Sequence, residues 1–143
     1  MRDGRATWAD LASELDLTAP AIGQRVRRLQ ERGIIRQFTA WVEPSVLANV
    51  SAFVAVSLER PDAHARFRRE VEKLDEVQEC YQVAGENGYL LKLRCRSLAQ
   101  LGELVSSVLP KMGAASVRAS VVLSTVKESP LLPIAQDEEA VAR

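Results

Sequence analysis

The chain has few cysteines, few aromatic residues and a single histidine. Its 143 residues include two cysteines, one histidine and 5% aromatic residues. Cys80 and Cys95 match no metal-ligand spacing and are too few for a disulfide framework, so we expect reduced core thiols, no metal site and no cofactor. No apolar run approaches the roughly 18–20 residues that span a bilayer, and the start has no signal-peptide pattern. The sequence therefore predicts a soluble cytoplasmic protein that does not contact a membrane.

Net charge is also absent, because 19 basic and 19 acidic side chains balance. This balance excludes a general polyanion binder. The charge is nevertheless uneven along the chain. Residues 17–41 contain one acid, Glu31, against five arginines, which are Arg25, Arg27, Arg28, Arg32 and Arg36. Such local charge favours a protein that contacts phosphates with one face, with modest affinity for each subunit.

Catalytic motifs are missing as well. The sequence has no Walker loop and no glycine-rich dinucleotide motif, and neither cysteine has a candidate base in its own segment. His64 lies in a helical stretch beside Asp62 and Arg66, so we expect it to be solvated. The carboxylates fall on predicted helix faces, where they are usually solvated. The sequence therefore predicts that the protein is not an enzyme.

The first part of the chain has a helix-turn-helix pattern. Thr7 and Asp10 form a capping box for a first short helix. After a tight turn, Thr18 is a good N-cap for a second helix, and Pro20 falls in its first turn, where a missing N–H costs little. Gly33 then ends this second helix.

The second helix has two faces. Its apolar stripe consists of Ile22, Val26 and Leu29. The opposite face carries Pro20, Gln24, Arg27 and Glu31, with Arg28 beside them. A winged helix-turn-helix presents a helix of this kind to the major groove. An ordinary helical hairpin with a solvated arginine face is the alternative.

Three boundaries follow from the composition. Residues 34–42 alternate roughly between β-branched or aromatic residues and others, which predicts a strand, and Glu43-Pro44 breaks it. We therefore expect a helix-turn-helix domain with a linking strand at residues 1–42 and a linker at 43–50. Residues 128–143 are predicted to form an irregular tail.

Residues 51–127 read as strand, helix, strand, hairpin, strand, helix, strand. The strands are expected at 52–58, 77–83, 89–95 and 117–124. The first helix has the stripe Ala63, Phe67, Val71 and Leu74; the second, capped by Ser97, has Leu98, Leu101, Val105, Val108 and Met112. This order predicts a ferredoxin-like βαββαβ sandwich, and an α+β protein overall. Both helices are expected to cover one face of the sheet. Because the other face also carries apolar residues, we expect it to pack against a second subunit.

Several short motifs, in their order along the chain, resemble those of the Lrp/AsnC (feast/famine) family of transcription regulators. The resemblance depends on Asp3-Gly4-Arg5, Asp10-Leu11-Ala12, Leu17-Thr18, Arg25-Val26-Arg27-Arg28-Leu29, Glu31-Arg32-Gly33-Ile34-Ile35, Cys80-Tyr81-Gln82-Val83-Ala84-Gly85 and Tyr89-Leu90-Leu91-Lys92-Leu93. It implies a transcription regulator whose partners are double-stranded DNA and a small-molecule effector, usually an amino acid. It also implies homodimers that assemble further, often to octamers.

The resemblance assigns the residues that contact DNA. They are Thr18, Pro20, Ala21, Gln24 and Arg25, with Arg27 and Arg28 chiefly on phosphates. Gln24 is the candidate for base readout, because its amide can pair bidentately with adenine. For Arg25 the alternative is a salt bridge to a carboxylate such as Glu14.

The resemblance also places the effector pocket at a hairpin near a subunit boundary. Its residues here are Ala84, Gly85, Glu86, Asn87, Gly88 and Tyr89, with Ser120 as a neighbour from the last strand. Gly88 stands where many relatives carry an aspartate, so the usual ammonium partner is missing and Glu86 is its candidate substitute. Alternatively, the pocket takes a different ligand, or Asn87-Gly88 only closes the hairpin.

A second departure lies at the start. The resemblance implies a helix before Asp3-Gly4-Arg5, whereas this sequence begins at Met1-Arg2, so we expect a winged domain without its first helix. We therefore expect part of the apolar stripe formed by Leu11, Leu15 and Leu29 to be exposed. A late-assigned start, a shortened chain and coverage by another subunit all stay open. The alternative function is an effector-sensing and oligomerisation module with impaired or vestigial DNA binding.

Overall fold

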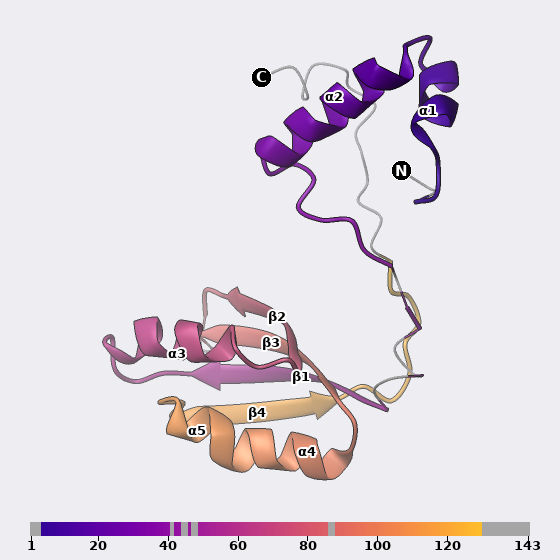
Figure 1. Ribbon diagram of the computed structural model, residues 1–143. Helices are drawn as coiled ribbons and strands as arrows, with labels where there is room; N and C mark the ends of the chain where they lie inside the picture. Colours follow the sequence, from indigo (N-terminus) through magenta and orange to yellow (C-terminus); the bar gives the residue numbers. More distant parts are fainter. Residues whose placement is uncertain (1–3, 41, 44–45, 47–48, 86–87, 130–143) are drawn as a thin grey trace. The chain divides into compact units, whose positions relative to one another are not determined.

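The computed structural model describes residues 4–40, 42–43, 46, 49–85 and 88–129 (Figure 1). The chain divides into two compact units, each with its own internal contacts. One unit comprises Met1–Trp41 with Glu128–Arg143, and the other comprises Val42–Lys127. No helix among the described residues is long and apolar enough to cross a bilayer.

The first unit begins with a short helix, α1 (Trp8–Glu14), that has the expected capping box. The Asp10 backbone N–H donates to Thr7 Oγ1 at 3.2 Å, and the Thr7 backbone N–H donates to Asp10 Oδ2 at 2.8 Å. The two hydrogen bonds satisfy amides that a helix N-terminus otherwise leaves without partners. Hydrogen bonds from the Thr7 side chain and backbone also lower the pKa of the exposed Asp10 carboxyl.

The second helix, α2 (Ala19–Glu31), is bounded as the sequence predicts. The backbone N–H of Ala21 donates to Thr18 Oγ1 at 3.4 Å, and Pro20 lies in the first turn. At the other end Gly33 adopts a left-handed φ of 70°. Its N–H donates to Gln30 O and that of Ile34 to Leu29 O, both at 2.9 Å, which is a Schellman motif.

The two helices pack through small and branched side chains. Ala12 of α1 is 7% exposed and Ile22 of α2 is 3% exposed. Asp16, with a φ of 51°, makes the tight turn between the helices. Leu15 is 57% exposed, as expected for a stripe that is only partly covered, whereas Leu11 and Leu29 are half-buried.

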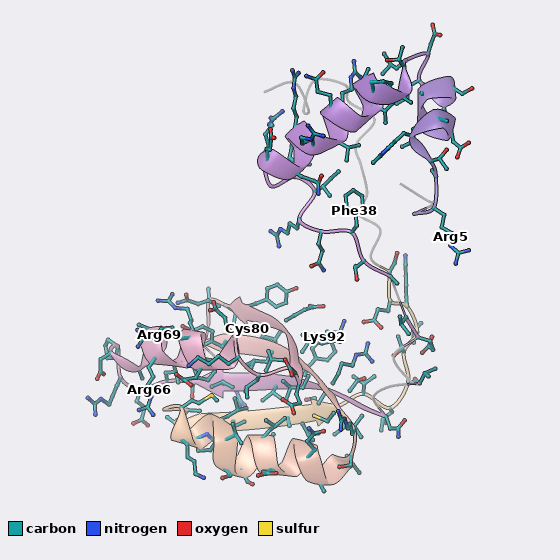
Figure 2. The ribbon with its side chains drawn as sticks, viewed as in Figure 1. Arg5, Phe38, Arg66, Arg69, Cys80 and Lys92 are labelled. Carbon is teal, nitrogen blue, oxygen red and sulfur yellow. The ribbon has the colours of Figure 1, made fainter. Side chains whose placement is uncertain are left out.

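The linking strand expected at residues 34–42 is absent from residues 34–40 and 42, which are the described part of that range. The Ile34 and Ile35 amides both donate to Leu29 O instead, as part of the α2 terminus. Phe38 then stands 64% exposed on an extended segment (Figure 2). The prediction was wrong for a single chain because a strand forms only with a ladder partner, and none of the described strands pairs with this segment.

The second unit has the predicted ferredoxin-like topology (Figure 1). Its sheet consists of β1 (Val50–Ser57), β2 (Val77–Gln82), β3 (Tyr89–Cys95) and β4 (Ser116–Val121), in the order β2-β3-β1-β4 with antiparallel pairing. The first crossover is α3 (Ala63–Val71). The second crossover is α4 (Leu98–Glu103), a π-helical segment (Leu104–Val108) and α5 (Leu109–Lys111). Both crossovers cover the same face of the sheet.

Strict alternation along two central strands builds the core. Val54 and Val56 of β1 and Leu91 of β3 are at most 1% exposed and point toward the helices. From α3, Phe67 and Val71 fill the space above them. Burial of such side chains contributes about 1.5–3 kcal/mol each, so this layer holds the second unit together.

The second crossover departs from the predicted apolar stripe at one residue. Leu101 is buried, and Val105, Val108 and Met112 are half-buried and pack against the core as expected, whereas Leu98 is 63% exposed. Leu98 is the first residue of α4 and precedes the π-helical segment, which changes the angular position only of the residues that follow it. Pro110 has no N–H to donate to the carbonyl four residues before it, which favours such an irregular turn.

We expect Phe67→Ala to lower the free energy of unfolding by about 3–5 kcal/mol, because it opens a cavity under α3. Leu98→Ala is the matched control in the same unit and should change it by no more than about 0.5 kcal/mol, because that side chain already contacts solvent. Urea unfolding of both variants at one protein concentration measures the difference. Equal losses would contradict the placement of the core.

Candidate nucleic-acid interface and effector loop

The arginine-bearing face of α2 is open to solvent. Gln24, Arg27, Arg28 and Pro20 are exposed on the side away from the buried Ile22, and Arg25, one turn after Ile22, is exposed as well. Ala21 is half-buried, and the Thr18 hydroxyl accepts the α2 cap bond. The structure therefore places the seven predicted DNA-contacting residues within the first three turns of one helix and its cap.

The charges on this face are not neutralised within the unit. No ion pair within 4.0 Å involves Arg25, Arg27 or Arg28 among the residues that the structure describes. The alternative of an Arg25–Glu14 bridge is therefore not what the structure shows. Three guanidinium groups on a rigid helix form a positively charged surface that suits phosphate oxygens.

The predicted effector loop leaves the sheet at the end of β2. The Val83 N–H donates to the Gly88 carbonyl at 3.1 Å, which closes the loop. Ala84 and Gly85 are exposed, and Gly85 has a φ of 119° that side-chain-bearing residues rarely adopt. Glu86 and Asn87 lie outside the described residues, so their assignment stays a prediction.

Tyr89 follows the loop directly and is 1% exposed. Its ring lies 4.9 Å from that of Phe67, centroid to centroid, and its hydroxyl is hydrogen-bonded to His64 Nδ1 at 3.1 Å. The expectation that His64 is solvated was therefore wrong, since the side chain is half-buried against Tyr89. The spacing of His64, Phe67 and Val71 on one helix face was the signal that could have found this contact.

Two further predicted effector residues lie in different places. Gly88 is half-buried, and a Cβ there would lie 3.8 Å from Val56 O and 4.0 Å from His64 Cε1. Ser120 lies on β4, opposite Phe53, with β1 and β3 between it and the strand that leads into the loop. Within one chain the structure thus groups Gly88 with Tyr89 and keeps Ser120 apart from them.

The face of the sheet without helices carries apolar side chains around a polar cluster. Phe53 is 44% exposed and Leu90 is 36% exposed. Between them and the sheet edge, Lys92 Nζ lies 3.2 Å from Glu79 Oε1, and the Tyr81 hydroxyl donates to Glu79 Oε2 at 2.8 Å. The hydrogen bond to Glu79 raises the pKa of the Tyr81 hydroxyl. Such a face is typical of a surface that pairs with another chain.

Comparison with known proteins adds two domain models and close relatives. The model described as winged helix-turn-helix DNA-binding matches residues 1–36, and the Lrp/AsnC ligand binding domain matches residues 51–132. The leucine-responsive regulatory proteins of Escherichia coli K12 and Salmonella typhimurium are 36% identical to this chain, over 93% of it and 84% of theirs. These matches define a DNA-binding transcription regulator that responds to a small-molecule effector.

Solved structures agree with this class. The leucine response regulatory protein of Mycobacterium tuberculosis superposes with a TM-score of 0.79 at 31% identity, covering 88% of this chain and 86% of that one. A Neisseria meningitidis transcriptional regulator, solved in complex with L-methionine, gives 0.80 at 31% identity, covering 91% and 86%. The chain belongs to the Lrp/AsnC family.

Gly85→Ala should lower the free energy of unfolding by about 1–3 kcal/mol, because the left-handed backbone there strains any side chain. A Cβ at Gly85 meets nothing within 4 Å, so the whole cost comes from the backbone. Gly102 in α4 is the matched control; its Cβ would also meet nothing, and Gly102→Ala should stabilise by about 0.5–1 kcal/mol. Thermal unfolding measures the change in stability of each variant. A change of the same sign for both variants would contradict the loop conformation.

Proposed function

We propose that α2 is the recognition helix of this regulator and that Gln24 reads bases while Arg27 and Arg28 bind phosphates. The observation that carries the proposal is the exposed, unneutralised arginine face of α2 opposite Ile22. Phosphate contacts orient a protein on the duplex, and base-edge contacts select the sequence. Thr18, Pro20, Ala21 and Arg25 complete the contact surface. We further propose that the protein acts in the cytoplasm and is not an enzyme.

The effector we propose is an amino acid, bound at the loop of residues 84–89. A relative of similar fold is solved in complex with L-methionine. The exposed backbone at Ala84 and Gly85 lets a ligand carboxylate approach amide N–H groups closely. In this proposal Glu86 takes the ammonium group, because position 88 is a glycine.

We also propose that the sheet face without helices pairs two chains, and that such dimers assemble further, to octamers. Phe53 and Leu90 expose apolar surface at the centre of that face. The Glu79–Lys92 pair beside them gives the face a charge pattern that fixes the register of pairing. A homodimer also brings two copies of α2 to one DNA site, which raises a modest affinity for each chain.

Gln24→Ala should weaken binding to a DNA fragment from upstream of the protein's own gene by about 1–3 kcal/mol, and should relax sequence preference, because the variant cannot pair bidentately with a base. Arg28→Ala should weaken binding to all sequences alike and reduce the slope of log affinity against log salt by about 0.9 for each phosphate that is no longer neutralised. Gel shifts at several salt concentrations measure both effects. Arg69→Ala on α3 is the control and should change neither. If the affinity of the wild type for DNA does not depend on salt concentration, the proposal is contradicted, and an effector-sensing module with vestigial DNA binding is favoured.

Phe53→Asp should convert the dimer to a monomer, because pairing would bury a carboxylate without a partner. Leu98→Asp, on the helical side of the same unit, is the matched control and should leave the dimer intact. Sedimentation velocity gives the masses, and circular dichroism confirms folding. A monomeric wild type, or a folded dimer of the Phe53 variant, would show that this face does not pair chains.

A further inference from the structure

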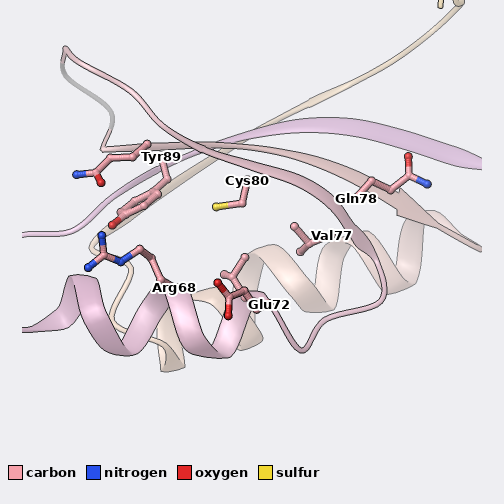
Figure 3. A pocket seen from close by; sticks show the side chains of 8 residues that line it. Arg68, Glu72, Val77, Gln78, Cys80 and Tyr89 are labelled. Atoms are coloured by element: carbon pink, nitrogen blue, oxygen red, sulfur yellow. The ribbon is translucent and has the colours of Figure 1, made fainter. Parts of the chain in front are cut away.

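A cavity of about 500 Å³ lies between α3 and the edge strand β2 (Figure 3). We call it the α3–β2 cavity. It is lined by Arg68, Val71, Glu72, Val77, Gln78, Cys80, Gln82 and Tyr89. Its volume falls in the usual range for small-molecule sites, about 300–1,000 Å³. None of the residues proposed above to contact DNA or the effector lines it, apart from Tyr89.

The cavity exists because the helices do not cover the edge of the sheet completely. Cys80 and Gln82 pair with Leu91 and Tyr89, so their side chains point to the helical face. Leu91 and Tyr89 are buried there, yet Cys80 and Gln82 stay exposed, so the expectation of a core thiol holds for Cys95 and was wrong for Cys80. A strand that packed under α3 would carry apolar residues at such positions. Polar residues here indicate a space that holds water or a polar ligand.

One basic and one acidic side chain line the α3–β2 cavity on its α3 side. Arg68 lies on α3 and Glu72 is the C-cap of that helix, and because the two are four residues apart they share a face. No ion pair within 4.0 Å joins these two side chains, both of which belong to the described residues. Figure 3 shows the Arg68 guanidinium near the Tyr89 hydroxyl and Glu72 below the Cys80 thiol. Burial and the Glu72 charge together raise the pKa of Cys80, so the carboxylate acts on the interior of the cavity.

We propose that the α3–β2 cavity is a second small-molecule site, which binds a free amino acid with a polar side chain. The Arg68 guanidinium binds the α-carboxylate, the Glu72 carboxylate binds the α-ammonium group, and the ligand side chain extends along β2 toward Gln82. A zwitterion fits because its two charges complement two fixed charges of opposite sign. The Gln78 amide oxygen already accepts from Arg94 at 3.2 Å, which leaves Gln82 as the amide for the ligand.

The site is connected to the effector loop through one residue. Tyr89 lines the cavity and is also the first residue of β3 after the loop. Its hydroxyl is held by His64, so the ring and the start of β3 are fixed together. A ligand against this ring therefore contacts the same element that carries the loop. The inference deepens the proposed amino-acid response and depends on it.

Cys80 makes the site directly measurable, because Figure 3 shows its thiol directed into the cavity. The full chain is treated with iodoacetamide at pH 8.5, with and without L-glutamine, and alkylation of each cysteine is followed by mass spectrometry. At ten times the dissociation constant, L-glutamine should slow alkylation of Cys80 about tenfold, since about a tenth of the sites stay empty. Cys95, 1% exposed, is the internal control and should not react in folded protein.

Analogues and variants separate the two charged contacts. Glutaramic acid, which lacks the ammonium group, and 4-aminobutanamide, which lacks the carboxylate, should protect Cys80 much less than L-glutamine. Arg68→Gln and Glu72→Gln should both abolish protection. Because Glu72→Gln also removes a charge that raises the thiol pKa, each rate is compared with the same variant without ligand. Arg69 is on the same helix but does not line the cavity. In the Arg69→Gln variant, L-glutamine should therefore protect Cys80 as it does in the wild type.

Two outcomes would overturn the inference in different ways. If L-glutamine raises the melting temperature, Gly85→Ala removes that rise and Cys80 is never protected, the effector binds only at the loop and the proposed function stands. If none of the twenty amino acids raises the melting temperature and none protects Cys80, both the proposed amino-acid response and this second site are contradicted. The gel shift above then still tests DNA binding on its own.

Discussion

The buried phenol of Tyr89 fixes the relation between the proposed effector loop and the core of the second unit. Its ring packs on Phe67, 4.9 Å away between centroids, and its hydroxyl reaches His64 at 3.1 Å. A buried hydroxyl without a partner would cost about 1–3 kcal/mol, so the pair holds α3 and the start of β3 in one arrangement. A ligand that moves the loop must therefore act against a rigid anchor. Such a ligand can shift the equilibrium between two loop conformations only by the difference in its binding free energy to each of them.

Helix α2 shows how local chemistry alone can build a binding surface. Thr18 starts the helix, Gly33 ends it, and Ile22 fixes which side faces α1. Because Ile22 faces α1, Arg27 and Arg28 lie on the opposite side of the helix and point to solvent. The positive surface thus results from the cap, the terminus and the apolar contact together. The charge needs no partner within the unit, and this keeps it available to phosphate oxygens.

Features that depend on neighbours along the chain could be predicted from the sequence, and features that depend on distant partners could not. The Thr7 capping box, the Gly33 terminus and the strands expected at 52–58 and 89–95 have local signals, and all are confirmed. The strand at 34–42 failed because pairing requires a second strand, and none of the described strands pairs with residues 34–40 or 42. The stripe failed only at Leu98, the first residue of α4, whose burial depends on whether the fold places another element over that end of the helix. The α3–β2 cavity gave no signal, since residues 68–72 and 78–82 meet only through the fold.

The absence of net charge limits how such a protein can bind DNA. If three arginines of one α2 each neutralise a phosphate, the salt slope is about −2.7 for a chain, which corresponds to weak binding at physiological ionic strength. Two chains on one duplex double that slope without changing the neutral charge of the whole molecule. In the proposed dimer the apolar face around Phe53 and Leu90 would pair the chains and leave α2 for DNA. In that proposal one unit pairs the chains and the other recognises DNA, so a ligand near Tyr89 would act on pairing without contacting the recognition helix.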